Sequence, residues 1–327
     1  MSEITVCVPV FNAGAFVGHT LESIAAQSFA DIKVLISLDR SDDDSEAVCR
    51  RYLADSRFEL VVQPERLGWV RNANALIARV DTPFFCITPH DDLLAPRYLA
   101  EVHALATSDL SVACAYTDME CFGVTGHGVI LQPDIRGSTV DRITEFLLDH
   151  FNAVAFRGLV RRHDAEDRPY LPTGLQGDFA ADTVWMFDLA LRGELRRVPR
   201  PLYAKRYYAG SVHAGWGAWP REKLVRLWAV HTAVCVRKAL DRTEDIHDAE
   251  RVLSAAFIRV AGMGKAAENV AAPRGPREVA DATTAFCEAL GQAPSSRLDA
   301  VLALPDGRYL RNIIARHASR RSLASPT

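Results

Sequence analysis

The first 120 residues alternate between apolar runs of strand length and amphipathic segments of helical length, and this alternation constrains the fold more than any other feature. In the first amphipathic segment, Phe16, Leu21 and Ile24 fall on one helical face. Strands that are apolar on both faces and are separated by helices are typical of βα units. The apolar runs lie at residues 4–10, 32–38, 58–63, 84–88 and 112–120. The sequence therefore predicts an α/β fold with a mostly parallel sheet covered by helices.

Beyond residue 121 the pattern changes to a mixture of strands and helices, and after Pro220 it becomes almost purely helical. We expect a hairpin arm at 126–131, a helix at 142–151, a strand at 153–162 and a helix at 183–193 that ends at Gly193. Four further helices are expected at 221–240, 248–262, 277–290 and 306–318. These patterns predict a catalytic domain over residues 1–218 and a C-terminal helical extension over residues 219–327.

Charge and cysteine content exclude several classes of protein. The formal net charge is -3, which gives no electrostatic reason to expect a nucleic-acid partner. The seven cysteines are scattered through apolar runs and form no C-x-x-C pair, which is typical of reduced thiols in a cytoplasmic protein. No stretch approaches the ~18 consecutive apolar residues of a transmembrane segment, and the N-terminus shows no signal peptide. We expect a cytoplasmic protein, or one bound peripherally at the inner face of the membrane.

Polar residues follow four of the predicted strands at their carboxyl ends. The first strand ends in "PVFNA", the second in "LDRSDDDS" and the fourth in "TPHDD", while "ERLGWVRNANAL" leaves the third. Ligands of open α/β sheets bind outside the carboxyl ends of the strands, so Asn12, Asp39, Arg71 and Asp91 can converge there.

Each of these residues also has a purely structural interpretation. The acids at 42–44 suit a turn and a helix N-terminus, and Asp92 suits the start of the next segment. Arg71 and His90 are equally compatible with an exposed helix and a loop. Neither a phosphate-binding P-loop nor a G-x-G-x-x-G dinucleotide motif is present, since "AGAFVGHT" fails two of the four defining P-loop positions.

The order of these motifs resembles the family 2 glycosyltransferases, which have the GT-A fold. The resemblance spans roughly residues 1–215. It includes a strand that ends P-x-[YF]-N, the helix "TLESIAAQSF", an acidic turn, a glycine loop with "VRNANAL", an Asp-x-Asp-like strand end and the segment "AADTVWMFDLALRGELRRVPRPLY". It implies a nucleotide-diphospho-sugar transferase fold, in which a Rossmann-like mixed sheet is flanked by helices.

Three positions depart from the family pattern. Leu38 replaces the first acid of the Asp-Asp turn, Pro89 replaces the first acid of Asp-x-Asp, and Ala181 replaces the glutamate of Glu-Asp. In each pair the second acid is present, as Asp39, Asp91 and Asp182.

The resemblance also implies roles for individual residues. Asp39 would recognise the base, Asp91 would hold Mn²⁺ or Mg²⁺, and Asp182 would deprotonate the acceptor. His213 resembles a late histidine that some GT-A enzymes use as a further metal ligand. The remaining donor-binding residues would be Pro9, Phe11, Asn12, Arg71 and His90.

The implied reaction is inverting, metal-dependent transfer of a sugar from a nucleotide-diphosphate-sugar donor of the UDP, TDP or GDP type to a saccharide or other hydroxyl acceptor. Two alternatives remain. One is a nucleotidyltransferase, and the other is a degenerate protein that binds a nucleotide-sugar without catalysing its turnover. For the helical extension, the mixed charges favour an acceptor platform or a homodimer interface over a membrane contact.

Overall fold

The computed structural model describes residues 2–124, 126–149, 153–164, 168–208 and 218–291. The chain divides into two compact units. The sheet unit comprises Met1–Arg136, Ala153–Gly174 and Arg192–Ala214, and the helical unit comprises Gly137–Asn152, Leu175–Leu191 and Gly215–Thr327. The helical unit therefore takes two segments from the N-terminal two thirds of the sequence. The domain boundary at residue 218 stays a prediction.

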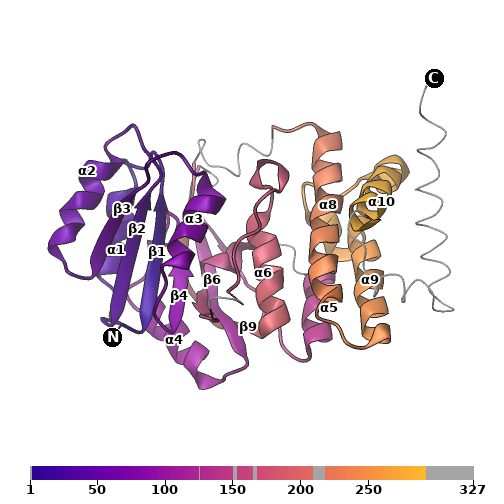
Figure 1. The fold of residues 1–327 in the computed structure, drawn as a ribbon, viewed down its shortest axis with the longest axis horizontal. Coiled ribbons are helices and arrows are strands. Elements are labelled where there is room, and N and C mark those ends of the chain that lie inside the picture. Colours follow the sequence, from indigo (N-terminus) through magenta and orange to yellow (C-terminus); the bar gives the residue numbers. More distant parts are fainter. Residues whose placement is uncertain (1, 125, 150–152, 165–167, 209–217, 292–327) are drawn as a thin grey trace. The chain divides into compact units, whose positions relative to one another are not determined.

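One nine-stranded sheet forms the centre of the sheet unit. Its strand order is β3-β2-β1-β4-β8-β6-β9-β5, and β7 pairs with β6. Figure 1 shows β3, β2, β1 and β4 side by side in this order. The strands are β1 (Ile4–Val10), β2 (Ile32–Leu38), β3 (Phe58–Val62), β4 (Phe84–Ile87), β5 (Leu93–Leu94), β6 (Val112–Gly123), β7 (Gly128–Ile130), β8 (Leu159–Arg161) and β9 (Glu194–Tyr207). The predicted α/β class is confirmed, and the bounds of β1 and β2 match the apolar runs in the sequence.

The first four strands are parallel, as the sequence predicts. β1 pairs with β2 and β4, and β2 pairs with β3. The pairs between β4 and β8 and between β6 and β8 are antiparallel, so the sheet is mixed beyond β4. Because β1, β2 and β4 run in the same direction, their carboxyl ends lie at one edge of the sheet. The candidate site lies at these carboxyl ends.

Helices cover both faces of these strands. Helices α1 (Val17–Ala25), α2 (Ser45–Arg50) and α4 (Tyr98–Ser108) contribute to a core with Val6 and Val8 of β1. Helix α3 (Trp69–Ala78) contacts β1 and β2 but contributes no residue to that core. Successive residues of a strand point to opposite faces, so α3 covers the other face of the sheet.

Residues 153–162 differ from the prediction of a single strand. Ala153–Arg157 forms a 3-10 helix, η2, and only Leu159–Arg161 joins the sheet as β8. Gly158 lies between the two, and a Cβ at this position would be 2.7 Å from the Cys114 sulfur and 2.8 Å from the Ala115 carbonyl oxygen. The close approach of the backbone to β6 at Gly158 requires glycine, and it marks where the chain enters the sheet.

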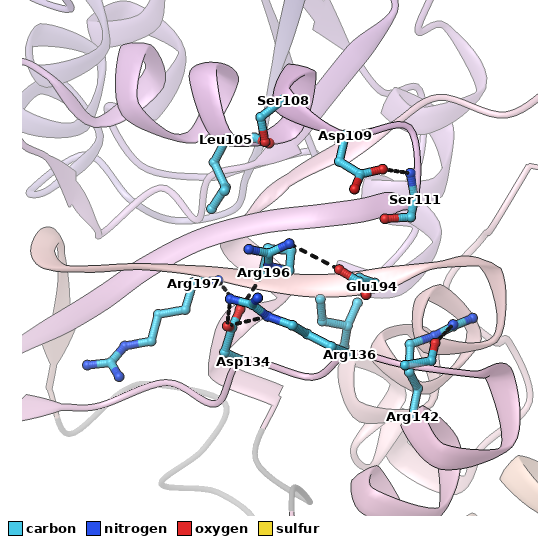
Figure 2. Close-up of polar contacts among 12 residues, drawn as sticks. Leu105, Ser108, Asp109, Ser111, Asp134, Arg136, Arg142, Glu194, Arg196 and Arg197 are labelled. Atoms are coloured by element: carbon cyan, nitrogen blue, oxygen red, sulfur yellow. Dashed lines mark hydrogen bonds and ion pairs between the residues drawn. The ribbon is translucent and has the colours of Figure 1, made fainter.

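The parallel pair of β6 and β9 is the longest in the sheet and contains register shifts near Asp118. β9 carries Pro199 and Pro201, which lack an amide hydrogen for the strand ladder, and this accounts for the irregular pairing. The buried Asp118 accepts two hydrogen bonds from Arg197, at 2.7 and 2.6 Å. In Figure 2, the Arg196 side chain lies between Asp134 and Glu194, near the irregular part of the β6–β9 pair. The ion pair between Arg197 and Asp118 joins β9 to β6 at the place where the pairing is irregular.

The helical unit packs α5 (Thr139–Asp149), α6 (Ala181–Arg192), α8 (Arg221–Leu240), α9 (Ile246–Val260) and α10 (Gly275–Gly291) together. α8 has the predicted bounds, and α9 begins at an N-cap, Asp245, whose side chain accepts from the amides of His247 and Asp248. Arg259 is buried with its guanidinium carbon 4.2 Å from the Trp228 ring centroid. The helix expected at 306–318 lies outside the described residues. Among the described helices, none has the length and apolarity that spanning a membrane requires.

Candidate functional site

The loops after β1 and β2 are tied together by side chains that sequence reasoning assigned to a turn or to ligand binding. Asn12 has a positive φ of 44°, and its Oδ1 accepts a hydrogen bond from the Asp42 amide at 3.1 Å. The Asn12 amide donates to Ser41 Oγ at 2.9 Å. The Gly14 amide donates to Asp43 Oδ2 at 2.8 Å. Side-chain hydrogen bonds therefore join the loops at the carboxyl ends of β1 and β2.

Asp39 lies directly after β2, where it is almost completely buried. Its two carboxylate oxygens accept hydrogen bonds from the amides of Leu67 at 2.6 Å and Gly68 at 2.9 Å. Gly68 has a φ of 80°, a conformation that favours glycine, immediately before α3. Asp39 thus fixes the loop that leads into α3. A carboxylate has about four lone-pair positions, so it retains capacity for a ligand.

Phe11 follows β1, and the Arg66 guanidinium carbon lies 3.6 Å from its ring centroid. Arg66 is exposed and was missed by sequence reasoning, although it stands in the glycine-containing loop after β3. Arg71 lies in the first turns of α3, and its Nε donates to the Leu67 carbonyl at 2.9 Å. The predicted roles of Phe11 beside a base and of Arg71 at a diphosphate stay predictions.

The two adjacent carboxylates after β4 have opposite environments. Asp92 is buried, and its Oδ2 forms an ion pair with Arg157 Nε at 2.6 Å and accepts from the Tyr203 hydroxyl at 3.1 Å. Its Oδ1 accepts from the Arg206 amide at 3.1 Å. Burial disfavours the charge on Arg157, but the Asp92 carboxylate outweighs this and raises the pKa of the guanidinium. Asp92 is a structural acid, paired within the sheet unit.

Asp91 has no such pairing, because within the described residues no other residue donates a hydrogen bond to its carboxylate. Burial raises the pKa of Asp91 above its ordinary value, and the neighbouring charge of Asp92 raises it further against the opposing effects of His90 and Arg157. An acid that is partly buried, near another acid and without a donor is poised to bind a cation.

His90 is fixed by its contact with the first strand. Its Nδ1 lies 3.1 Å from the Pro9 carbonyl oxygen. Because a carbonyl oxygen only accepts hydrogen bonds, Nδ1 must carry the hydrogen, and Nε2 of the neutral ring keeps its lone pair. Both His90 and Pro9 are thus at the predicted site, where His90 presents a nitrogen that can accept a hydrogen bond or bind a metal.

A second arginine missed by sequence reasoning is Arg206, near the end of β9. Its Nε donates to the Asp91 carbonyl at 3.2 Å, and its guanidinium carbon lies 5.0 Å from the Phe16 ring centroid. Phe16 also contacts Tyr208, with ring centroids 4.9 Å apart. Burial raises the pKa of Tyr208 to about 12, and the charges of Asp91 and Asp92 act in the same direction. The signal in the sequence is "YAKRYY", a run of basic and aromatic residues directly after the "PLY" motif.

The fit of this site to a divalent cation can be judged from its donors. No group of three His, Cys, Asp or Glu side chains in the part of the chain described here could hold a metal without help. Mg²⁺ sites, however, usually combine one or two carboxylates with substrate phosphates and water. The carboxylate of Asp91, which no other described residue pairs, fits that arrangement. The Nε2 of His90 would add a nitrogen ligand, which Mg²⁺ takes less readily. His213, the second predicted metal ligand, lies outside the described residues.

The predicted catalytic base, Asp182, belongs to the helical unit. It lies in the first turn of α6, and its Oδ1 accepts a hydrogen bond from the Thr183 amide at 3.0 Å. The backbone just before it is left-handed at Asp178, with φ 53°, and at Ala180, with φ 50°. Non-glycine residues adopt this conformation rarely, and such strain concentrates at functional sites.

Comparisons with known proteins agree with this architecture. Residues 5–164 match the model of glycosyl transferase family 2. EpsH of Bacillus subtilis (strain 168), whose name assigns it to the glycosyltransferases, is 28% identical over 215 residues, which are 64% of this chain and 57% of that protein. The match therefore spans less than two thirds of this relative.

Two solved structures share the fold. TarS 1-349 of S. aureus in complex with UDP-GlcNAc has a TM-score of 0.66 at 16% identity, covering 97% of this chain and 89% of that one. The mannosyltransferase PcManGT from Pyrobaculum calidifontis, in complex with GDP-Man and Mn²⁺, has a TM-score of 0.54 at 17% identity, covering 98% and 87%. Over residues 5–164 the chain is therefore similar to glycosyl transferase family 2, and its fold is of the GT-A type.

Proposed function

We propose that this chain is an inverting glycosyltransferase that moves a sugar from a nucleotide-diphosphate-sugar to an acceptor hydroxyl with a divalent metal. The observation that carries the proposal is the contrast between Asp91 and Asp92 in a family 2 sheet. Asp92 is neutralised by Arg157, whereas Asp91 has no donor from another described residue. A carboxylate can face a diphosphate only if a cation lies between them, because the two are otherwise mutually repulsive.

The residues that would hold the metal are Asp91 and His90, with the remaining ligands supplied by the donor diphosphate and water. Bound there, Mn²⁺ or Mg²⁺ would neutralise the diphosphate and stabilise it as a leaving group. An imidazole nitrogen beside a carboxylate suits Mn²⁺ better than Mg²⁺, which prefers oxygen ligands only. The relative that binds Mn²⁺ with GDP-Man supports the same choice.

The nucleoside would bind at the ends of β1 and β2. Phe11 offers a ring for the base, Arg66 offers a cation stacked on that ring, and Asp39 offers the remaining lone pairs of a fixed carboxylate. A ring N–H of uracil, thymine or guanine could donate to Asp39. Complexes of UDP-GlcNAc and of GDP-Man with proteins of this fold support a nucleotide-sugar as the ligand class.

Asp182 would act as the general base. A sugar hydroxyl is a weak nucleophile at neutral pH, and a positioned carboxylate that accepts its proton contributes about 10²–10⁴-fold to the rate. Inversion follows if the acceptor attacks the anomeric carbon directly, because a single displacement needs a base and no covalent intermediate. The left-handed backbone at Asp178 and Ala180 supports a functional role for this turn.

The products distinguish this function from its alternatives. A glycosyltransferase releases a nucleoside diphosphate, a nucleotidyltransferase releases pyrophosphate, and a binding protein releases neither. The test is to screen UDP, TDP and GDP by thermal shift with Mn²⁺, Mg²⁺ and EDTA, and then to analyse the products formed from the matching donor. A nucleotide at ~100 times its dissociation constant should add about 2.7 kcal/mol of stability. Binding that EDTA leaves unchanged would contradict the metal assignment.

The wider predictions from the sequence belong to the same proposal. They are a catalytic domain over 1–218, a helical extension over 219–327 that serves the acceptor or a homodimer, and a cytoplasmic location. Size-exclusion chromatography with light scattering tests the dimer directly.

A further inference from the structure

Arg206 is held in one orientation by four contacts with the residues around Asp91. Its amide donates to Asp92 Oδ1 at 3.1 Å, and its Nε donates to the Asp91 carbonyl at 3.2 Å. Its guanidinium carbon lies 5.0 Å from the ring centroid of Phe16 and 4.6 Å from that of Phe122. An arginine side chain on a surface loses much rotational freedom when it binds a ligand, and these contacts have already restricted that freedom.

The charge of Arg206 distinguishes it from the other arginines nearby. Arg157 pairs with Asp92, Arg197 pairs with Asp118, and Arg200, on the same strand as Arg206, pairs with Glu101. Among the described residues, no carboxylate lies within ion-pair distance of Arg206, and its two terminal nitrogens have no protein acceptor. Arg206 is partly exposed.

A fixed guanidinium whose terminal nitrogens lack a carboxylate partner suits a ligand with paired anionic oxygens. Two parallel N–H groups match the oxygens of a phosphate in a bidentate contact, which a point charge such as lysine cannot reproduce. The guanidinium carbon is also near two aromatic rings, Phe16 and Phe122, and the terminal nitrogens remain for hydrogen bonding to a ligand.

We propose that Arg206 binds the diphosphate of the donor and stabilises the charge that develops on it during transfer. The proposal rests on the function proposed above. In that reaction the bond between the anomeric carbon and the diphosphate oxygen breaks, and its electron pair stays on that oxygen. The acceptor oxygen forms the new bond to the anomeric carbon, and its proton passes to Asp182. Arg206 thus adds a fixed positive charge beside the Asp-x-Asp-like strand end, where Pro89 stands in place of the first acid and supplies no carboxylate for the metal.

A merely structural role for Arg206, in which it only supports the Asp91–Asp92 turn, makes a different prediction. Loss of that support would disturb the whole nucleotide site and lower the stability of the sheet unit. Loss of a phosphate contact would weaken only ligands that carry the diphosphate.

The experiment compares UDP, TDP and GDP with uridine, thymidine and guanosine on the wild type, Arg206→Gln, Arg206→Lys and Arg200→Gln, all at a fixed Mn²⁺ concentration. Calorimetry measures the diphosphates, and ligand-observed NMR measures the nucleosides. Arg200→Gln is the matched control, because it makes the same substitution on the same strand at an arginine paired with Glu101. Thermal unfolding of each variant monitors the fold.

For whichever diphosphate the wild type binds, we expect Arg206→Gln to raise the dissociation constant at least ~10-fold, with Arg206→Lys intermediate. The affinity for the matching nucleoside should change less than about twofold, and Arg200→Gln should behave as the wild type. Equal losses for diphosphate and nucleoside, or an unchanged diphosphate affinity in Arg206→Gln, would overturn the assignment. Failure of the wild type to bind any of UDP, TDP and GDP would instead refute the proposed function itself.

Discussion

Replacing Asp92 with alanine should damage stability, whereas replacing its neighbour Asp91 should damage ligand binding. Asp92→Ala removes the acceptor of three hydrogen bonds, from Arg157, Tyr203 and the Arg206 amide. The Arg157 side chain is nearly buried, so its charge would remain inside the sheet unit without its carboxylate.

The size of the effect follows from this geometry. Removal of one partner from a buried ion pair destabilises a protein by about 3–5 kcal/mol, because the remaining charge is left desolvated. For a unit of this size, each kcal/mol lowers the melting temperature by about 2–4 °C, which gives a decrease of about 6–20 °C. Asp92→Asn keeps one acceptor oxygen and should fall between the wild type and Asp92→Ala.

Asp91→Ala is the matched control. Burial and the charge of Asp92 already disfavour the Asp91 carboxylate, as its raised pKa indicates, and no other described residue donates a hydrogen bond to it. Its removal should therefore leave the stability of the free protein unchanged or slightly increased. The same variant should lose metal-dependent binding of the nucleoside diphosphate.

Urea unfolding followed by circular dichroism measures the first difference, and calorimetry with UDP or GDP and Mn²⁺ measures the second. Both variants should be compared at pH 7 without ligand, so that binding does not contribute to stability. A loss of stability that is the same in both variants would refute the division of roles. So would an Asp91→Ala variant that binds the metal and nucleotide as the wild type does.

Three further predictions concern Asp43, Asp182 and Asp39. Burial acts to raise the pKa of Asp43, but hydrogen bonds from Ser45 and Gly14 outweigh it and hold the pKa below 3.8. Because Asp43 is exposed and solvent screens its contacts, Asp43→Ala should cost about 0.5–1 kcal/mol at pH 7. Because a lowered pKa stabilises the fold above the unfolded-state value, this difference should disappear as the pH falls through the folded-state pKa, and a constant difference from pH 7 to pH 2 would contradict it. Asp182→Asn should keep nucleotide affinity and the melting temperature but lose transfer by at least ~10²-fold, and near-normal transfer rates would make Asp182 only a helix N-terminal residue. Asp39→Asn should weaken nucleotide binding and speed hydrogen exchange at the amides of Leu67 and Gly68. The reason is that the asparagine NH2 group, a donor, would replace one of the two oxygens that now accept from these amides. Amides that stay protected in this variant would show that Asp39 does not hold the loop.

Local sequence patterns determined much of the fold. The apolar runs at 4–10 and 32–38 became β1 and β2 with the same bounds, and the segment 221–240 became α8. Such segments can be recognised in the sequence, because buried parallel strands are apolar on both faces and the apolar residues of amphipathic helices recur about every 3.6 residues. The order of the strand-end motifs could also be recognised in the sequence. It indicated the resemblance to family 2 glycosyltransferases before any contact was known.

The roles of individual side chains were decided only by the tertiary structure. Asp91 and Asp92 are adjacent and chemically identical in the sequence, and they differ because Arg157, 65 residues later, reaches only one of them. Arg206 comes close to the same turn from 115 residues away. The separation of 153–162 into η2 and β8 likewise depends on the approach of Gly158 to β6. Burial and charge pairing come from residues that are distant in the sequence, so local spacing can place a carboxylate at the site but cannot show whether it is already neutralised.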